Sequence, residues 1–310
     1  MELSIVVPCY NEESVLPETA RRLAELLQKL IAGGTVRATS RIYFVDDGST
    51  DATWSMVAAL AARLPCIKGI KLSRNCGHQL ALLAGLLTVP GDAVISIDAD
   101  LQDDLDAIEH MIDAHAKGSE IVYGVRKKRD TDTLLKRFTA EGYYRLLGVL
   151  GVEVVFNHAD YRLMSRRALN ALSAYEEVNV FLRGMIPQLG FRTSTVYYDR
   201  QERFAGESKY TLRKMLALAW NGITSFSPTP LRIITAVGFV IAMLSLALSA
   251  WALTVRLLGY YTVPGWASSV VAIYFLGGLQ LFSIGLIGEY LAKIYLEVKR
   301  RPRFQIETTV

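Results

Sequence analysis

Two long segments in the last third of the chain carry no charged side chain, and they limit what this chain can fold into. Residues 233–255 and 257–288 lack Asp, Glu, Lys and Arg over 23 and 32 residues. About 20 apolar residues are enough to cross the hydrocarbon core of a bilayer. A pair of buried core helices is the alternative, but uncharged segments of this length are rare in soluble domains. The sequence therefore predicts two transmembrane helices, at about 233–255 and 267–289.

Basic residues predict how this hairpin is oriented. The short connection at 259–266 contains no Lys or Arg and is flanked only by Arg256, whereas several basic residues lie on the outer side of both segments. They are Arg213, Lys214 and Arg232 before the first segment, and Lys293, Lys299, Arg300, Arg301 and Arg303 after the second. Because positive loops stay on the cytoplasmic side, we expect a cytoplasmic N-terminal part and a basic cytoplasmic tail at 293–310.

The segment just before the hairpin has the pattern of an amphipathic helix. Within 210–224, apolar residues such as Leu212, Leu216 and Trp220 share one helical face. This pattern fits a helix lying in the bilayer interface, and it fits an ordinary surface helix equally well. Two prolines in Ser225–Pro230 end the pattern, so 210–230 is expected to be a juxtamembrane helix and linker.

The first 209 residues are expected to form one cytoplasmic α/β domain. Apolar strand patterns at 3–8, 41–45, 67–72, 93–97 and 120–124 alternate with helical patterns at 14–31, 51–64, 78–87 and 105–117. Such alternation predicts a mostly parallel sheet with helices on both faces. Ligands bind beyond the carboxyl ends of the strands in such sheets. The GxGxxG and GxxxxGK[ST] motifs are absent, which argues against a dinucleotide or P-loop site.

Acidic residues follow two of these expected strands. Asp98 and Asp100 are two positions apart, so on an extended chain their carboxylates point the same way and can bind one hard cation. A bound Mg²⁺ or Mn²⁺ could then hold the phosphates of a nucleotide-sugar. Asp47 follows the second strand and Glu12 the first; they could accept hydrogen bonds from the base and the ribose, or could cap helices. Acidic strand ends are common, so the metal-binding interpretation of Asp98 and Asp100 depends on their position after a wholly apolar strand and opposite a second acidic loop, Asp46-Asp47.

Several segments together resemble glycosyltransferase family 2. They are Ile5–Glu12 (IVVPCYNE), Val45–Asp51 (VDDGSTD), Asp98–Asp103 (DADLQD), Gly124–Arg126, Tyr161–Leu163 and Arg203–Lys209. The resemblance covers nearly the whole chain and is strongest to polyisoprenyl-phosphate glycosyltransferases, namely dolichyl-phosphate mannose synthases and bacterial bactoprenol glucosyltransferases. It implies the GT-A fold, which is Rossmann-like with a mostly parallel sheet.

The resemblance also implies roles for single residues. The nucleotide-sugar positions are Pro8, Tyr10, Glu12, Val45, Asp47, Asp98, Ala99, Asp100, Gln102, Arg126, Arg203 and Lys209. The expected metal ligands are Asp98, Asp100 and Gln102, with Mg²⁺ or Mn²⁺ as the cofactor. The residues expected to contact the acceptor phosphate are Arg126, Arg137 and Arg162. Asp98, Asp100 and Asp160 are the catalytic candidates.

Some of these positions have alternatives. Asp160 is either a base or acceptor-orienting carboxylate, or a structural ion-pair partner of Arg162 or a neighbour. A serine of the family pattern is replaced by Glu141, which weakens the acceptor assignment near Arg137. Asp103-Asp104-Leu105 replaces the usual Asp-Pro-Pro, a change expected to alter only a turn. The loop 199–209 is either a lid that brings in Arg203 and Lys209 or a solvated charged loop. The histidines, including His78, are scattered and are not expected to bind metal.

Together these features predict an inverting enzyme that moves a hexose from a nucleotide-sugar to a polyprenyl phosphate. UDP-glucose and undecaprenyl phosphate are the expected substrates, at the cytoplasmic face of a bacterial inner membrane. Alternatives are another donor (GDP-mannose, a UDP-N-acetylhexosamine or a UDP-aminoarabinose derivative), or a non-catalytic subunit that binds nucleotide-sugars. Relatives suggest a homo-oligomer, with a tetramer as one form. A net charge of +4 with dispersed basic residues does not suggest nucleic-acid binding.

Overall fold

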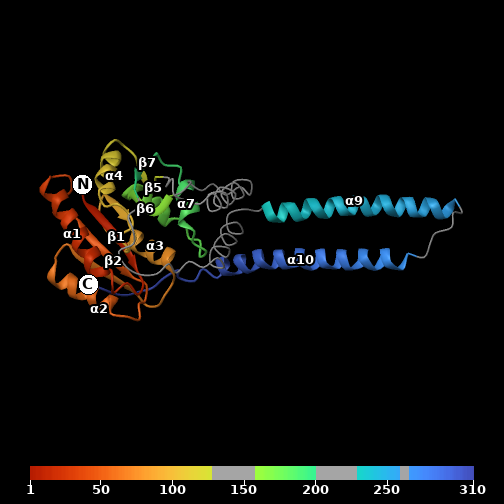
Figure 1. Cartoon of the computed structure of the whole chain (residues 1–310), viewed down its shortest axis with the longest axis horizontal. Helices are drawn as coiled ribbons and strands as arrows, with labels where there is room; N and C mark the ends of the chain where they lie inside the picture. Colours follow the sequence, from red (N-terminus) through yellow and green to blue (C-terminus); the bar gives the residue numbers. More distant parts are fainter. Residues whose placement is uncertain (128–157, 200–228, 259–264) are drawn as a thin grey trace.

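The computed structural model describes residues 1–127, 158–199, 229–258 and 265–310. These residues form an α/β domain and two long helices that extend away from it (Figure 1). The helices are α1 (Leu16–Ala32), α2 (Thr53–Arg63), α3 (His78–Thr88), α4 (Ala107–Ala116), α6 (Arg166–Ser173), α7 (Leu182–Gln188), α9 (Thr229–Leu257) and α10 (Trp266–Val298). The strands are β1 (Leu3–Cys9), β2 (Arg41–Asp46), β3 (Ile67–Leu72), β4 (Ala93–Ser96), β5 (Ile121–Arg126), β6 (His158–Ser165), β7 (Thr193–Tyr198) and β8 (Ile306–Thr309).

The strands form one eight-stranded sheet in the order β7-β5-β6-β4-β1-β2-β3-β8. The α/β class and all five expected strands are confirmed. The sheet is mixed, because β6 runs antiparallel to both β4 and β5, and β8 runs antiparallel to β3. The remaining four pairings are parallel.

Apolar side chains cover both faces of this sheet. Along β1, Leu3, Ile5 and Val7 pack into a core shared with α1, α2 and α4, while Val6 points to the opposite core. This alternation follows from the two-residue repeat of an extended strand. The second core contains α3, α6 and α7. Helices therefore cover both faces, as expected from the alternating sequence pattern.

The helix α3 lies close to the centre of the sheet because it has a glycine at the contact. A Cβ atom on Gly85 would come within 2.4 Å of Val6 Cγ1 and 2.9 Å of Val45 Cγ2. The backbone of α3 thus rests directly on β1 and β2. Since α3 begins at His78, this packing also fixes where the first residues of the helix lie relative to the ends of those strands.

The helices α9 and α10 correspond to the two expected transmembrane segments. Among the residues with described side chains, one helical segment is long and apolar enough to cross a membrane, Phe275–Val298 within α10. The described part of α9 contributes a shorter apolar segment, Thr229–Ile241. The residues expected to form the interfacial helix, 210–224, lie outside the described residues, as does most of the linker. Length and composition thus support one of the two expected spans, the one within α10.

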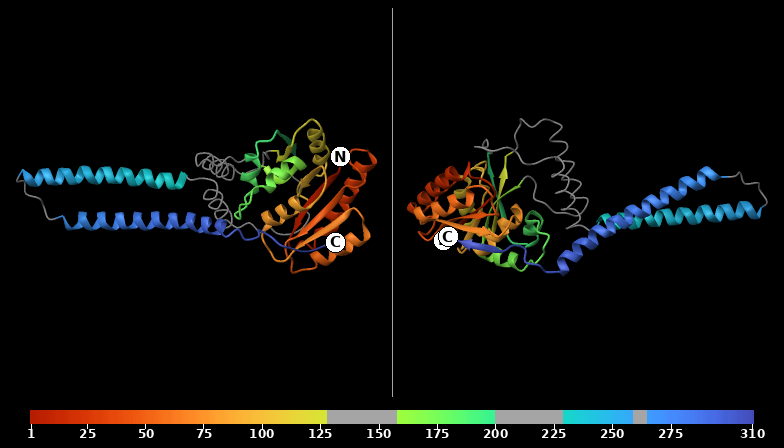
Figure 2. Two further views of the ribbon diagram at one scale, coloured as in Figure 1. Left: turned by 180° about the vertical axis from the view of Figure 1, so that it is seen from behind. Right: turned by 90° about the horizontal axis from the view of Figure 1, so that it is seen from below.

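The chain returns from α10 to the sheet of the α/β domain. Beyond α10, the strand β8 pairs with β3, and the backbone N–H of Gly69 donates to the carbonyl of Val310 at 3.0 Å. The Glu297 carboxylate accepts the backbone N–H groups of Val178 and Asn179 at 2.8 and 2.9 Å. The end of α10 therefore lies at the α/β domain, and the two views of Figure 2 show that the start of α9 lies on the same side. The tail expected at 293–310 ends in a strand of the sheet.

Candidate functional site

The loops that follow β1 and β2 are tied together by hydrogen bonds. Asn11 Oδ1 accepts the backbone N–H of Thr50 at 2.9 Å, and the N–H of Asn11 donates to Ser49 Oγ at 3.0 Å. The N–H of Glu12 donates to Thr53 Oγ1 at 2.9 Å. Asn11 has a positive φ of 52°, a conformation that Asn tolerates better than most residues. The structure thus brings the expected nucleotide-binding loops to one edge of the sheet.

The expected nucleotide-binding residues differ in what they expose. Tyr10 is exposed at the end of β1, whereas Pro8 is buried. The Val45 side chain is buried in the core that contains α3. A ligand at this position would therefore meet the backbone of Val45 rather than its side chain.

Asp47 is held in place by the loop that precedes α3. Its two carboxylate oxygens accept the backbone N–H groups of Cys76 and Gly77 at 2.7 and 2.8 Å. Gly48 makes this approach possible, because a Cβ there would lie 2.7 Å from backbone atoms of Arg74 and Asn75. Burial raises the pKa of Asp47, and these two hydrogen bonds oppose the rise.

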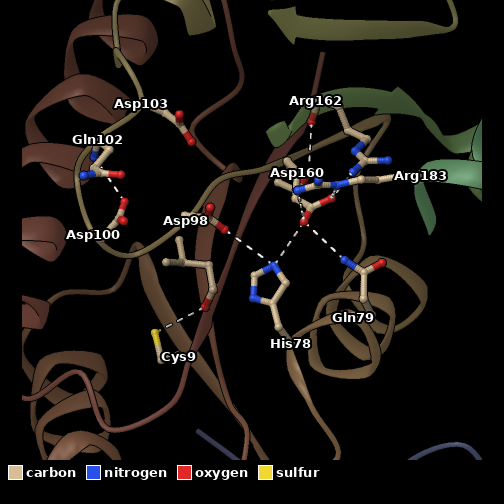
Figure 3. A network of polar contacts seen from close by, with 12 residues as sticks. Cys9, His78, Gln79, Asp98, Asp100, Gln102, Asp103, Asp160, Arg162 and Arg183 are labelled. Carbon is tan, nitrogen blue, oxygen red and sulfur yellow. Dashed lines mark hydrogen bonds and ion pairs between the residues drawn. The ribbon is translucent and has the colours of Figure 1, made fainter. Parts of the chain in front are cut away.

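The segment Asp98–Gln102 forms a turn and not the extended chain expected from the sequence. The strand β4 ends at Ser96, and Leu101 adopts a left-handed conformation with φ of 56°. Asp100 Oδ1 accepts the backbone N–H of Gln102 at 3.2 Å, while Asp98 turns toward His78 (Figure 3). A positive φ at leucine is unfavourable and is typical of functional loops. The two carboxylates therefore do not have the parallel orientation that we expected of an extended chain.

The side-chain oxygen atoms of this turn are suitable ligands for a hard divalent cation. Asp98, Asp100 and Gln102 supply carboxylate and amide oxygens, the ligands that Mg²⁺ prefers. Within the described residues, no group of three His, Cys, Asp or Glu side chains is arranged to hold a metal ion. Mg²⁺ sites in phosphoryl-binding enzymes need fewer protein ligands, because one or two carboxylates act with substrate phosphates. The residues present fit a cation that binds together with a diphosphate.

A cluster of charged and polar residues centred on the buried Asp160 lies beside Asp98, with Arg162 also buried and the His78 side chain 41% exposed. Asp160, on β6, accepts hydrogen bonds from Arg162 at 2.5 Å, from Arg183 at 3.2 Å and from Gln79 at 3.2 Å. His78 Nε2 lies 3.4 Å from Asp160 Oδ2 and 3.6 Å from Asp98 Oδ1, so it connects the two carboxylates. Figure 3 shows the imidazole between them. The members of the cluster come from β6, α3, α7 and the loop after β4.

These contacts separate the pKa values of the two carboxyl groups. Burial raises the pKa of Asp98 to about 6, and the neighbouring carboxylates add to the rise while His78 opposes it. Burial acts on Asp160 in the same direction, but the contact with His78 and the charges of Arg183 and Arg162 hold its pKa well below the usual range. Burial lowers the pKa of His78, and the contact with Asp160 and the charge of Asp98 outweigh this and raise it. Asp160 is thus a weak proton acceptor, which supports the alternative of an ion pair with Arg162.

The structure does not support Arg162 as a contact for the acceptor phosphate. Its side chain is fully buried and donates to Asp160, and its buried Nε and Nη1 atoms have no hydrogen-bond partner among the residues that the structure describes. Arg126 is different, because a quarter of its side chain is exposed. Its Nη2 donates to Asp103 at 3.0 Å and its Nε to the Tyr198 hydroxyl at 3.2 Å. Asp103 therefore holds Arg126 at the edge of the site and does more than form a turn.

Several expected residues lie outside the described residues. They are Arg137, Arg203, Lys209 and Glu141, together with most of the loop 199–209. The sequence interpretation also missed three residues that the structure brings into the site: His78, Gln79 and Arg183. For His78 and Gln79 the only signal in the sequence was their position after a strand and a short loop. Arg183 had no such signal.

Two known family models match this chain. The model of glycosyl transferase family 2 matches residues 4–173, which include β1 to α6. The chain belongs to glycosyltransferase family 2. A second model, the GtrB C-terminal hairpin, matches residues 229–294. This family 2 chain therefore combines a glycosyltransferase domain with a hairpin module already defined in other proteins.

Relatives of this family 2 chain match it along its whole length. A glycosyltransferase of Bacillus subtilis, YkoT, is 52% identical over 98% of this chain and 91% of that protein. The bactoprenol glucosyl transferase of Shigella phage SfII is 41% identical over 99% of this chain and 98% of that protein. Among solved structures, mannosyl-3-phosphoglycerate synthase from Rubrobacter xylanophilus is 17% identical, covers 86% of this chain and 78% of its own, and gives a TM-score of 0.48.

Proposed function

We propose that this chain transfers glucose from UDP-glucose to undecaprenyl phosphate at the cytoplasmic face of a bacterial inner membrane. One observation carries the proposal: proteins named bactoprenol glucosyl transferase match both the catalytic domain and the hairpin, at 41% identity over 99% of this chain. The product would be a lipid-linked sugar for modification of cell-envelope glycans.

The site supports binding of a nucleotide-sugar in one orientation. The nucleoside would lie at the tied loops after β1 and β2, near Tyr10, Glu12 and Asp47. The diphosphate would lie at the turn that carries Asp98 and Asp100. A divalent cation held there by Asp98, Asp100 and Gln102 would supply positive charge to the diphosphate as it leaves. Arg126, fixed by Asp103, and the undescribed Arg137, Arg203 and Lys209 are the proposed cationic contacts for donor and acceptor phosphates.

The reaction needs little proton transfer. A phosphate monoester has a second pKa of about 6, so the lipid phosphate is largely dianionic at neutral pH. One of its oxygens attacks the anomeric carbon of glucose, and the bond from that carbon to the β-phosphate oxygen breaks with its electrons going to UDP. Attack opposite the leaving group inverts the anomeric carbon. The lowered pKa of Asp160 is compatible with this, because an orienting carboxylate need not accept a proton.

The path of the chain supports two membrane spans and not one. Residues 306–309 pair with β3 of the catalytic domain. If Phe275–Val298 crosses the bilayer toward that domain, α9 must have crossed in the other direction. Large apolar side chains are exposed along both helices, which in water would be an unusual surface. They include Ile233, Phe239, Val240, Trp251, Phe275, Leu281, Phe282, Ile284 and Leu291. Lipid and the hairpins of a homo-oligomer would cover them.

The direct test uses purified full-length chain in nanodiscs with undecaprenyl phosphate, Mn²⁺ or Mg²⁺ and a panel of labelled nucleotide-sugars. The panel contains UDP-glucose, UDP-N-acetylglucosamine, a UDP-aminoarabinose derivative and GDP-mannose. We expect label to enter the lipid phase from UDP-glucose at least ten times faster than from the other donors. Faster transfer from another donor would replace glucose in the proposal. Nucleotide binding with no transfer from any donor would favour the non-catalytic binding subunit.

A further inference from the structure

Four consecutive residues contact both ends of the proposed donor site. The backbone N–H groups of Cys76 and Gly77 donate to Asp47, at the nucleoside end. The next residue, His78, lies against Asp98, at the diphosphate end. Gln79 then donates to Asp160 at 3.2 Å. The segment 76–79 thus connects two loops that follow different strands.

The position of His78 is fixed by the backbone on which it sits. Gly77 has a φ of 93°, a conformation open to glycine and strained for other residues. His78 then begins α3, and Gly85 presses that helix against β1 and β2. The imidazole therefore projects from a rigid element, which is where a precisely placed side chain is best supported.

The two carboxylates beside His78 are held very differently. Asp160 has a side chain that is 5% exposed and is bonded to Arg162, Arg183 and Gln79. Asp98 has a side chain that is 33% exposed and lies in a turn. The distances from His78 Nε2, 3.4 and 3.6 Å, are those of ion-pair contacts and are longer than typical short hydrogen bonds. Asp160 is the fixed group, and His78 connects the more exposed Asp98 to it.

We propose that His78 is a positioning residue that holds the Asp98 carboxylate in the orientation needed to bind a divalent cation together with the donor diphosphate. The inference rests on the proposed function. It assigns the cluster around Asp160 a purpose that an isolated ion pair between Asp160 and Arg162 would not have. Residues that orient metal ligands in this way typically change metal affinity or activity by about 10- to 100-fold when they are replaced.

The test measures Mn²⁺ binding in the presence of UDP by electron paramagnetic resonance, using the full-length protein and its His78→Ala and His78→Gln variants. We expect His78→Ala to raise the Mn²⁺ concentration for half-saturation about 10- to 100-fold. His78→Gln keeps an N–H donor and is expected to recover part of this loss. UDP affinity without metal, measured by calorimetry, should change less than about twofold, since the N–H groups that hold Asp47 belong to the backbone.

Controls separate positioning from folding. His110 is an exposed histidine on α4 that is not assigned to the site, so His110→Gln should leave Mn²⁺ binding unchanged. Melting temperatures show whether each variant is folded, and if His78→Ala is not, His78→Gln and His78→Asn give the comparison. A folded His78 variant without a side-chain N–H donor, such as His78→Leu, that binds Mn²⁺ and UDP like the wild type would overturn the inference. A wild type that neither binds Mn²⁺ with UDP nor transfers sugar would overturn the proposed function itself.

Discussion

Replacing Asp100 by Asn is expected to lower kcat/KM for sugar transfer by about 10³-fold or more. The amide keeps the shape of the side chain and an oxygen that can accept the N–H of Gln102, so the turn should persist. It removes the negative charge that would hold the cation. Cation stabilisation of a leaving phosphate is worth several kcal/mol, and each 1.4 kcal/mol is about a tenfold change in rate. Transfer of labelled glucose to undecaprenyl phosphate measures the effect.

A matched control distinguishes this effect from a general loss of charge. Asp106 is exposed at the start of α4, so Asp106→Asn should keep transfer within about twofold of wild type. Removing divalent metal with a chelator should reproduce the Asp100→Asn loss in the wild type, and added Mn²⁺ should restore activity. An Asp100→Asn variant with more than half of the wild-type rate would contradict the assignment.

Replacing Gly85 by Val is expected to destabilise the catalytic domain by about 3 kcal/mol. The new side chain would have to occupy space already taken by Val6 and Val45, both fully buried. Overpacking of a well-packed core typically costs about 1–3 kcal/mol. Because the contact is between a helix and the strands beneath it, the backbone of α3 has to shift for the variant to fold.

Thermal unfolding of the full-length protein in detergent measures this effect. Ala62→Val is a suitable comparison, since Ala62 is exposed on α2 and its change should cost less than about 0.7 kcal/mol through helix propensity. Equal melting temperatures for Gly85→Val and wild type would mean that α3 does not rest on the sheet as described.

The sequence was sufficient to predict the first five strands, β1 to β5, but not β7, which pairs parallel to β5. Strands β1 to β5 are short apolar segments separated by helical patterns, and in each case local pattern and burial agree. The strand β6 was missed because its sequence, HADYRLMS, mixes apolar and charged residues. Asp160 and Arg162 are both buried there and form an ion pair, and a local pattern does not reveal such a pairing. The strand β8 was also missed, because its pairing depends on β3, which lies more than 230 residues earlier and is not visible in a local pattern.

The candidate site was partly predictable. The acidic residues after β2 and β4 were found because they directly follow apolar strands. The orientation of Asp98 was not predictable, because it depends on a left-handed turn at Leu101 and on contacts with His78. His78, Asp160 and Arg183 are far apart in the sequence and meet only when α3, β6 and α7 pack around the sheet. Arg162 was assigned to the acceptor from its motif, and its complete burial shows that a motif position does not by itself predict exposure.

Inverting transfer to the lipid is tested by the anomeric configuration and stoichiometry of the product in a single reaction. Wild-type protein is incubated with UDP-glucose, labelled at the anomeric carbon, and undecaprenyl phosphate, and the products are analysed by nuclear magnetic resonance and chromatography. Since UDP-glucose is an α-glucoside, inverting transfer predicts β-glucosyl phosphate on the lipid and one UDP for each glucose transferred. An α-linked lipid product, or release of UDP with no sugar on the lipid, would contradict the proposed reaction.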